Sequence, residues 1–150
     1  MKKPIYQVTK LCDDRITNLL DYCSHQLTAK WALDVAHHVL YLFEDQNPSD
    51  ERPRQALRAL EQWIDGKISV SESRKFALAA HHAAKNATDP AAIAAARTSG
   101  HACAVCHVKT HAYGVSMYGI LASMYPSQGD SQPEREWQYN HLIELMNMKS

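Results

Sequence analysis

An alanine-rich stretch in the second half of the chain constrains the fold more than any other feature. Asp89 and Pro90, which precede it, form a strong helix start: a carboxylate to cap the helix, then proline at the first helical position. Alanine has the highest helix propensity, and small side chains let neighbouring backbones approach closely. We therefore predict a central packing helix here, with Thr98–Leu121 as its core. The small residues are Ala91, Ala92, Ala94, Ala95, Ala96, Gly100, Ala102 and Ala104.

The rest of the chain also shows helical periodicity, with apolar residues recurring every three or four positions. Gly66 is placed to end one helix, and Thr28 to cap another. Residues 67–70 are too short and isolated for a strand. We predict an all-α fold, a single domain over residues 1–150 built as a bundle of about six or seven helices. The expected helices cover residues 13–27, 29–44, 50–65, 71–87, 90 to about 124, and 131 onward.

Charge and composition exclude several classes of partner. The chain has 16 Lys and Arg against 16 Asp and Glu, so no overall field attracts nucleic acid or an anionic membrane. No apolar run approaches the roughly 18 residues of a membrane span, and the N-terminus lacks the apolar core of a signal peptide. Four cysteines without an export signal are typical of reduced thiols. We expect a cytoplasmic protein with no nucleic-acid or membrane partner.

The string Cys103-Ala104-Val105-Cys106-His107 has the spacing of a c-type haem attachment site. Covalent haem attachment follows export, for which there is no signal, and a helix packed on both faces leaves no room for a porphyrin. A redox dithiol would place its first cysteine at a helix N-terminus after a strand. We expect no cofactor.

A metal site would have to use the same segment. If the chain is helical throughout, Cys103, Cys106, His107 and His111 share one face, yet Cys103 and His111 lie roughly 12 Å apart along the axis. Four ligands on one straight helix cannot surround a single zinc ion. Two of these residues could bind zinc only if His81 or His82 supplied further ligands. We expect buried core histidines rather than a metal; the candidate ligands are His81, His107, His111 and Cys103.

The densest polar cluster is Asp50-Glu51-Arg52-Pro53-Arg54. Its simplest interpretation is a capped helix start, with Asp50 accepting amide hydrogens. The two arginines could also form ion pairs with Asp34 or Glu44, and a partner-binding role is the alternative.

Several blocks together resemble a known family. They are Trp31–Asp34 with His38–Leu40, Pro48–Ala56 with Glu61–Trp63, Ala79–Ala84, and Ala94–His111 with Ser116–Tyr118. This pattern resembles a family of small bacterial all-helical domains grouped with the immunity proteins of polymorphic toxin systems. The resemblance is strongest over residues 31–120. Cys103 and Cys106 depart from it, because small residues are expected there.

The resemblance implies a non-enzymatic protein that neutralises a cognate protein toxin by direct binding. An alternative is a protein that binds a small molecule or metal through buried histidines lining an interhelical pocket. An enzyme using these histidines with Asp34 or Glu44 as acid and base lacks a recognisable nucleophile. The candidate partner or pocket residues are Asp34, Glu44, Asp50, Arg52, Arg54, His81, His101 and His107.

Overall fold

The computed structural model describes residues 5–148, and within that range every regular element is a helix. If the single-turn α3 is counted with α2, which it directly follows, the described residues contain seven α-helices, in agreement with the predicted six or seven. The elements are η1 (Val8–Lys10), α1 (Asp14–Asp21), α2 (His25–Val39), α3 (Tyr41–Glu44), α4 (Arg52–Ile64), α5 (Val70–Asn86), α6 (Pro90–Ala104), α7 (His111–Met124) and α8 (Gln132–Met148).

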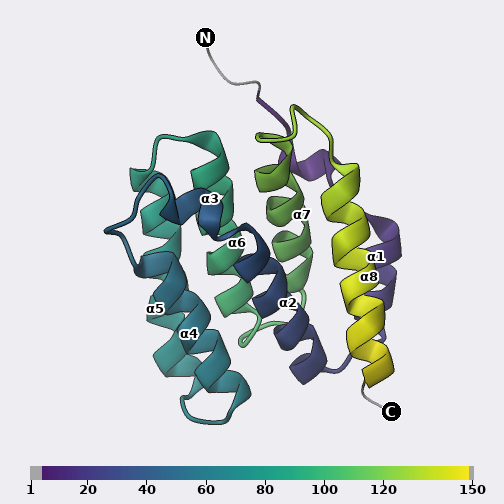
Figure 1. Cartoon of the computed structure of the whole chain (residues 1–150). Coiled ribbons are helices and arrows are strands. Elements are labelled where there is room, and N and C mark those ends of the chain that lie inside the picture. Colours follow the sequence, from purple (N-terminus) through teal and green to yellow (C-terminus); the bar gives the residue numbers. More distant parts are fainter. Residues whose placement is uncertain (1–4, 149–150) are drawn as a thin grey trace.

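Helix α6 lies at the centre of the bundle (Figure 1). It packs along α5 and α7 and also contacts α2, α3 and α4. Small side chains make this crowding possible because they let several helix axes approach one backbone. The predicted Asp89 cap is present and accepts a hydrogen bond from the Ala92 amide at 3.1 Å. The alanine-rich segment is therefore the central helix, as predicted. Its buried residues are Ala91, Ala92, Ala94, Ala95, Ala96, Thr98, Ser99, Gly100, Ala102 and Cys103.

The prediction of one continuous helix over Thr98–Leu121 is wrong. Helix α6 ends at Ala104, residues 105–110 form a turn, and α7 starts at His111. The predicted common face of Cys103, Cys106, His107 and His111 therefore does not exist, since Cys106 and His107 lie in the turn.

Contacts from a distant segment hold this turn. The His25 imidazole donates through Nε2 to the Val105 carbonyl at 2.6 Å, and Lys109 Nζ donates to the Cys23 carbonyl at 2.6 Å. The last turn of α6 also tightens, with the Val105 amide bonded to the carbonyl of Ala102 three residues back. This reversal lets α7 return alongside α6, an arrangement visible in Figure 1.

Helix boundaries in the first half also differ from the prediction. The expected helix 13–27 is divided, and α2 starts at His25 because Ser24 accepts a hydrogen bond from the Leu27 amide at 3.1 Å. Thr28, the predicted cap, is buried inside α2, and its hydroxyl has no hydrogen-bond partner in the described residues. The cap of α2 is therefore Ser24, four positions before the predicted Thr28.

The predicted helix 29–44 and the predicted start at Ser71 also shift. Helix α2 ends at Val39 before the short α3, and α5 starts at Val70. A capping box explains the second shift: Ser69 accepts from the Glu72 amide while Glu72 accepts from the Ser69 amide. Gly66 has a positive φ of 74°, in agreement with its predicted role after α4.

Trp31 anchors α2 against α8. Its ring is fully buried, and its Nε1 donates to the Gln138 carbonyl at 3.0 Å. The Gln138 side chain is buried as well and joins Ser116 of α7 and Glu134 of α8 by hydrogen bonds. Trp31 is thus a core residue, as expected of a buried indole with a satisfied N–H. Among the described residues, no helix has the length and apolar character needed to cross a membrane.

Candidate functional site

Three histidines from three consecutive helices meet on one side of the bundle. The ring centroids of His81 (α5) and His101 (α6) are 5.1 Å apart, and those of His101 and His111 (α7) are 5.8 Å apart. The His101 ring also stacks on Tyr118 at 5.1 Å. The cluster therefore contains two predicted pocket residues, His81 and His101, and two predicted metal candidates, His81 and His111.

Two glycines make room for these rings. A Cβ atom added to Gly100 would lie 2.6 Å from Nε2 of His81, and one added to Gly114 would lie 2.8 Å from Nδ1 of His101. Both distances are far below van der Waals contact. Each imidazole therefore packs directly on a helix backbone, and only glycine fits beneath it.

Arginine, not carboxylate, faces the imidazoles. Arg97 Nη1 lies 2.9 Å from Nδ1 of His81, and Arg74 lies 3.1 Å (Nη2) and 3.3 Å (Nε) from Nδ1 of His107. Since a guanidinium can only donate, each Nδ1 accepts and each of these two imidazoles is neutral.

Burial lowers the pKa of His81 to about 4, and the charge of Arg97 contributes next. Burial likewise lowers the pKa of His101 to about 4, followed by the effect of His81. The pKa of His107 is also lowered, by burial and then by Arg74. Near neutral pH, these three rings are uncharged polar groups beside fixed cations.

The predicted metal candidate Cys103 belongs to a different part of the packing. Its Sγ donates to the Ser73 carbonyl at 3.5 Å within an apolar cluster of α4, α5 and α6, and burial raises the pKa of this thiol to about 12. The Sγ atom of Cys106 lies 2.8 Å from Oγ of Ser73, and burial raises the pKa of the Cys106 thiol. The described residues contain no group of three or more His, Cys, Asp or Glu positioned to hold a metal ion.

Asp34 lies away from the histidine cluster, at the junction of α2 and α8. It accepts from Nε2 of His141 at 2.7 Å and forms an ion pair with Lys30 at 3.2 Å. The indole of Trp137 stacks between His141, at 4.9 Å, and His38, at 3.7 Å. Asp34 thus helps attach α8 to α2.

The polar cluster at the start of α4 forms two separate ion pairs. Arg54 binds Glu44 in a bidentate manner at 2.6 and 2.7 Å, which is one of the two pairings predicted from sequence. Arg52 binds Asp50 at 2.7 and 2.9 Å, while Asp50 also accepts from the Arg52 amide. Hydrogen bonds from these arginines lower the pKa of Glu44 and of Asp50.

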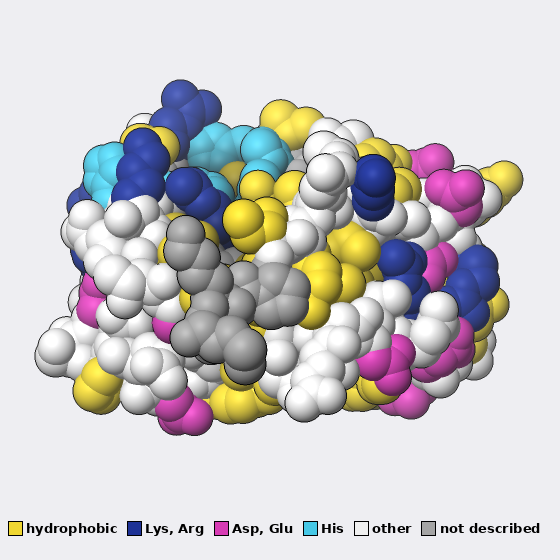
Figure 2. All heavy atoms as spheres, turned by 90° about the horizontal axis from the view of Figure 1, so that it is seen from above, with side chains coloured by type: hydrophobic (Ala, Val, Ile, Leu, Met, Phe, Trp, Pro, Cys, Tyr) yellow, Lys and Arg dark blue, Asp and Glu magenta, His cyan; other side chains and the backbone are white. Residues whose placement is uncertain are grey.

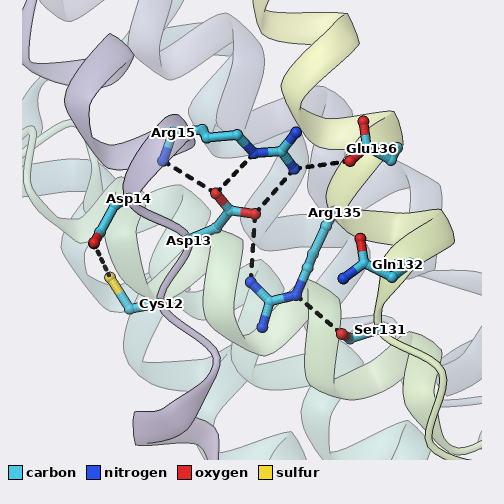
Figure 3. A pocket seen from close by; sticks show the side chains of 8 residues that line it. All are labelled: Cys12, Asp13, Asp14, Arg15, Ser131, Gln132, Arg135 and Glu136. Atoms are coloured by element: carbon cyan, nitrogen blue, oxygen red, sulfur yellow. Dashed lines mark hydrogen bonds and ion pairs between the residues drawn. The ribbon is translucent and has the colours of Figure 1, made fainter.

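A polar cleft between α1 and α8 was not predicted (Figure 3). Asp13 lies at its centre and accepts from the Arg15 amide at 3.1 Å, from the Arg15 guanidinium at 3.2 and 3.3 Å, and from Arg135 at 3.3 Å. The cleft has a volume of about 480 Å³. Its lining residues are Cys12, Asp13, Asp14, Arg15, Ser131, Gln132, Arg135 and Glu136.

The role of Asp13 in this cleft is structural. Burial acts to raise its pKa, but hydrogen bonds and charge from Arg15 and Arg135 outweigh burial and hold the pKa below its usual value. The carboxylate also caps α1, so one side chain fixes both the helix start and the position of α8. Asp13 and Arg135 are 122 positions apart, and nothing in the local sequence links them.

Comparison with known proteins adds one family match. A family model described as "Imm-5 like putative immunity protein" matches residues 18–145, which contain α2 to α7 and most of α8. No curated protein and no solved structure matches the chain.

Proposed function

Because this chain belongs to the Imm-5 like immunity protein family, we propose that it neutralises a cognate bacterial toxin by binding it directly. The match over residues 18–145 is the observation that carries this proposal. The partner is a protein toxin, and the encounter takes place in the cytoplasm, where the four free cysteines stay reduced. Affinity comes from shape-matched contacts with a few anchoring side chains, not from a chemical step.

The state of the nucleophilic groups supports binding over catalysis. The thiols of Cys103 and Cys106 have raised pKa values and are buried, which disfavours the reactive thiolate. His81 and His107 accept hydrogen bonds from arginine, whereas a general base is usually oriented by a carboxylate.

The geometry gives less support to a small-molecule pocket. Five surface depressions of the described residues, with volumes of 120 to 480 Å³, are lined by residues other than His81, His101 and His107. These rings instead pack on backbone, on one another or against arginine.

Co-expression tests the proposal. The toxin-like reading frame nearest to this gene is induced with and without this chain, and growth is measured. We expect growth to be restored, and the two proteins to co-purify at equal stoichiometry. Toxicity that persists at matched expression rejects the immunity role.

A second measurement separates binding from catalysis. The neutralised toxin is recovered from the complex under denaturing conditions, refolded, weighed by mass spectrometry and assayed again. Direct binding predicts unchanged mass and full recovery of toxicity. A changed mass, or protection by far less than one equivalent of this chain, contradicts the proposal.

A further inference from the structure

Seven of the nine histidines of this chain fall into two groups with different partners, and His25 and His37 belong to neither. On the α2–α8 side, His38 pairs with Glu134 at 2.8 Å and His141 pairs with Asp34 at 2.7 Å. On the α5–α6–α7 side, the charged and titratable neighbours that influence His81, His101 and His107 are all arginines, lysines or other histidines. We call this second group the imidazole–arginine face: His81, His82, His101, His107, His111, Arg74, Lys85 and Arg97.

Arginine pairing also differs between these sides. Arg15, Arg52, Arg54 and Arg135 each bind an aspartate or glutamate, whereas Arg74 and Arg97, like Arg58 of α4, form no ion pair with any described carboxylate. Nδ1 of His107 binds Arg74, and Nδ1 of His81 binds Arg97. Each guanidinium therefore keeps N–H donors that no described carboxylate occupies. Two parallel N–H donors of a guanidinium match the two oxygens of a carboxylate.

The face is also rigid and partly apolar. Gly100 and Gly114 let His81 and His101 pack directly on helix backbones, so these two rings lose little conformational freedom when a partner binds. Leu78, one turn before His82 on α5, is 56% exposed, and Val108, beside His107, is 51% exposed. Exposed apolar side chains bordering arginines are typical of protein–protein contact surfaces.

The space-filling view shows the histidines and their basic neighbours on the surface (Figure 2). Histidine side chains gather there with lysine and arginine at one edge of the molecule, while aspartate and glutamate are more frequent elsewhere. A chain with zero net charge therefore has a local cationic surface.

We propose that the imidazole–arginine face is the docking surface for an acidic segment of the toxin, an inference that rests on the proposed function. Toxin carboxylates bind Arg74, Lys85 and Arg97, His107 donates a hydrogen bond through Nε2, and Leu78 and Val108 pack at the rim. A protein segment fits better than nucleic acid, because exposed apolar side chains flank the cations and no aromatic stacking platform is exposed among them.

The experiment compares charge-reversal variants in binding to the purified toxin by calorimetry. Lys85→Glu and Arg74→Glu/Arg97→Glu are expected to weaken binding by at least about tenfold, and more at low salt. Lys85 is exposed, so its variant keeps the test valid if the double variant folds poorly. Arg58→Glu is the matched control, since Arg58 is an exposed arginine of α4 that acts on Glu44.

A second arm does not need the toxin. A synthetic Glu-rich decapeptide and an RNA oligonucleotide are each titrated into the chain at low salt while imidazole NMR signals are followed. The peptide is expected to shift His81, His101, His107 and His111 more than the control rings of His25, His38 and His141.

The outcomes separate the two proposals. Toxin binding that is unaffected by Lys85→Glu and the double variant overturns the docking surface and leaves direct neutralisation intact. A wild-type chain that does not bind toxin rejects the proposed function, and the peptide titration then decides the docking surface alone. Peptide shifts no larger at the face than at the control rings, or a stronger response to RNA, overturn the inference.

Discussion

The imidazole of His81 lies directly on the backbone of Gly100, so close that a methyl group on Gly100 would come within 2.6 Å of the ring. This contact joins α5 to the central helix. It also explains a glycine in the middle of α6, where glycine normally costs about 1 kcal/mol relative to alanine.

The first prediction tests this contact with Gly100→Ala. In the wild-type background the added methyl displaces His81 from Arg97, and overpacking of this kind costs roughly 1–3 kcal/mol. We expect a net loss of about 1 kcal/mol in the free energy of unfolding, measured with urea, after the helix-propensity gain is subtracted. In a His81→Ala background the same substitution should become stabilising by up to about 1 kcal/mol. Stabilisation by Gly100→Ala alone would contradict the contact.

The second prediction concerns acid stability. His81 and His101 have pKa values near 4 in the folded chain, against an ordinary value of 6.5. Since the unfolded chain binds more protons between these values, stability from the two rings is complete above pH 6.5 and is lost as the pH falls toward 4. The expected loss by pH 4 is roughly 3 kcal/mol for each ring, and about two thirds of it occurs by pH 5.

Urea unfolding between pH 7 and pH 5 measures this slope before most carboxylates titrate. His81→Gln/His101→Gln should flatten it, whatever its effect on stability at pH 7. Imidazole NMR titration checks the cause directly, and midpoints near 6.5 for both rings would refute it.

The elements most accessible to sequence analysis are those determined by nearby residues. The small residues of α6 and the Asp89–Pro90 start are local signals, and both were predicted. The end of α6 at Ala104 was not predicted, because contacts from Cys23 and His25 hold the turn and no glycine or proline marks it.

The histidine cluster was predicted only in part. His81, His101 and His111 were individually identifiable, but their meeting depends on the α6–α7 reversal. Gly100 was predicted only as one of the small residues of the central helix, whereas Gly100 and Gly114 each accommodate a ring from a neighbouring helix. A glycine that accommodates a distant side chain has no local signature.

The third prediction concerns Asp13, whose side chain is 7% exposed between two arginines. Asp13→Asn keeps the shape and a capping oxygen but leaves Arg135, itself 14% exposed, without its counter-ion. We expect the free energy of unfolding to fall by about 2 kcal/mol. Asp14→Asn is the matched control, since the exposed Asp14 side chain accepts a long hydrogen bond from Cys12 Sγ at 3.9 Å and forms no ion pair within the described residues. Equal effects of the two substitutions would show that the pairing with Arg135 is not important.

The fourth prediction separates the Glu44–Arg54 pair from the imidazole–arginine face. Both residues were candidate partner-binding residues, yet their bidentate contact leaves little of the arginine fork for a toxin carboxylate. At 31% and 39% exposure, the pair should have a coupling energy of at most about 1 kcal/mol in a double-mutant cycle of Glu44→Gln and Arg54→Met. Toxin affinity should stay within about twofold of wild type in each variant, because a paired, half-exposed charge at a distance from the contact contributes little. A loss of toxin affinity with Arg54→Met as large as that with Lys85→Glu would place α4 in the interface and require a larger docking surface than the face on α5, α6 and α7.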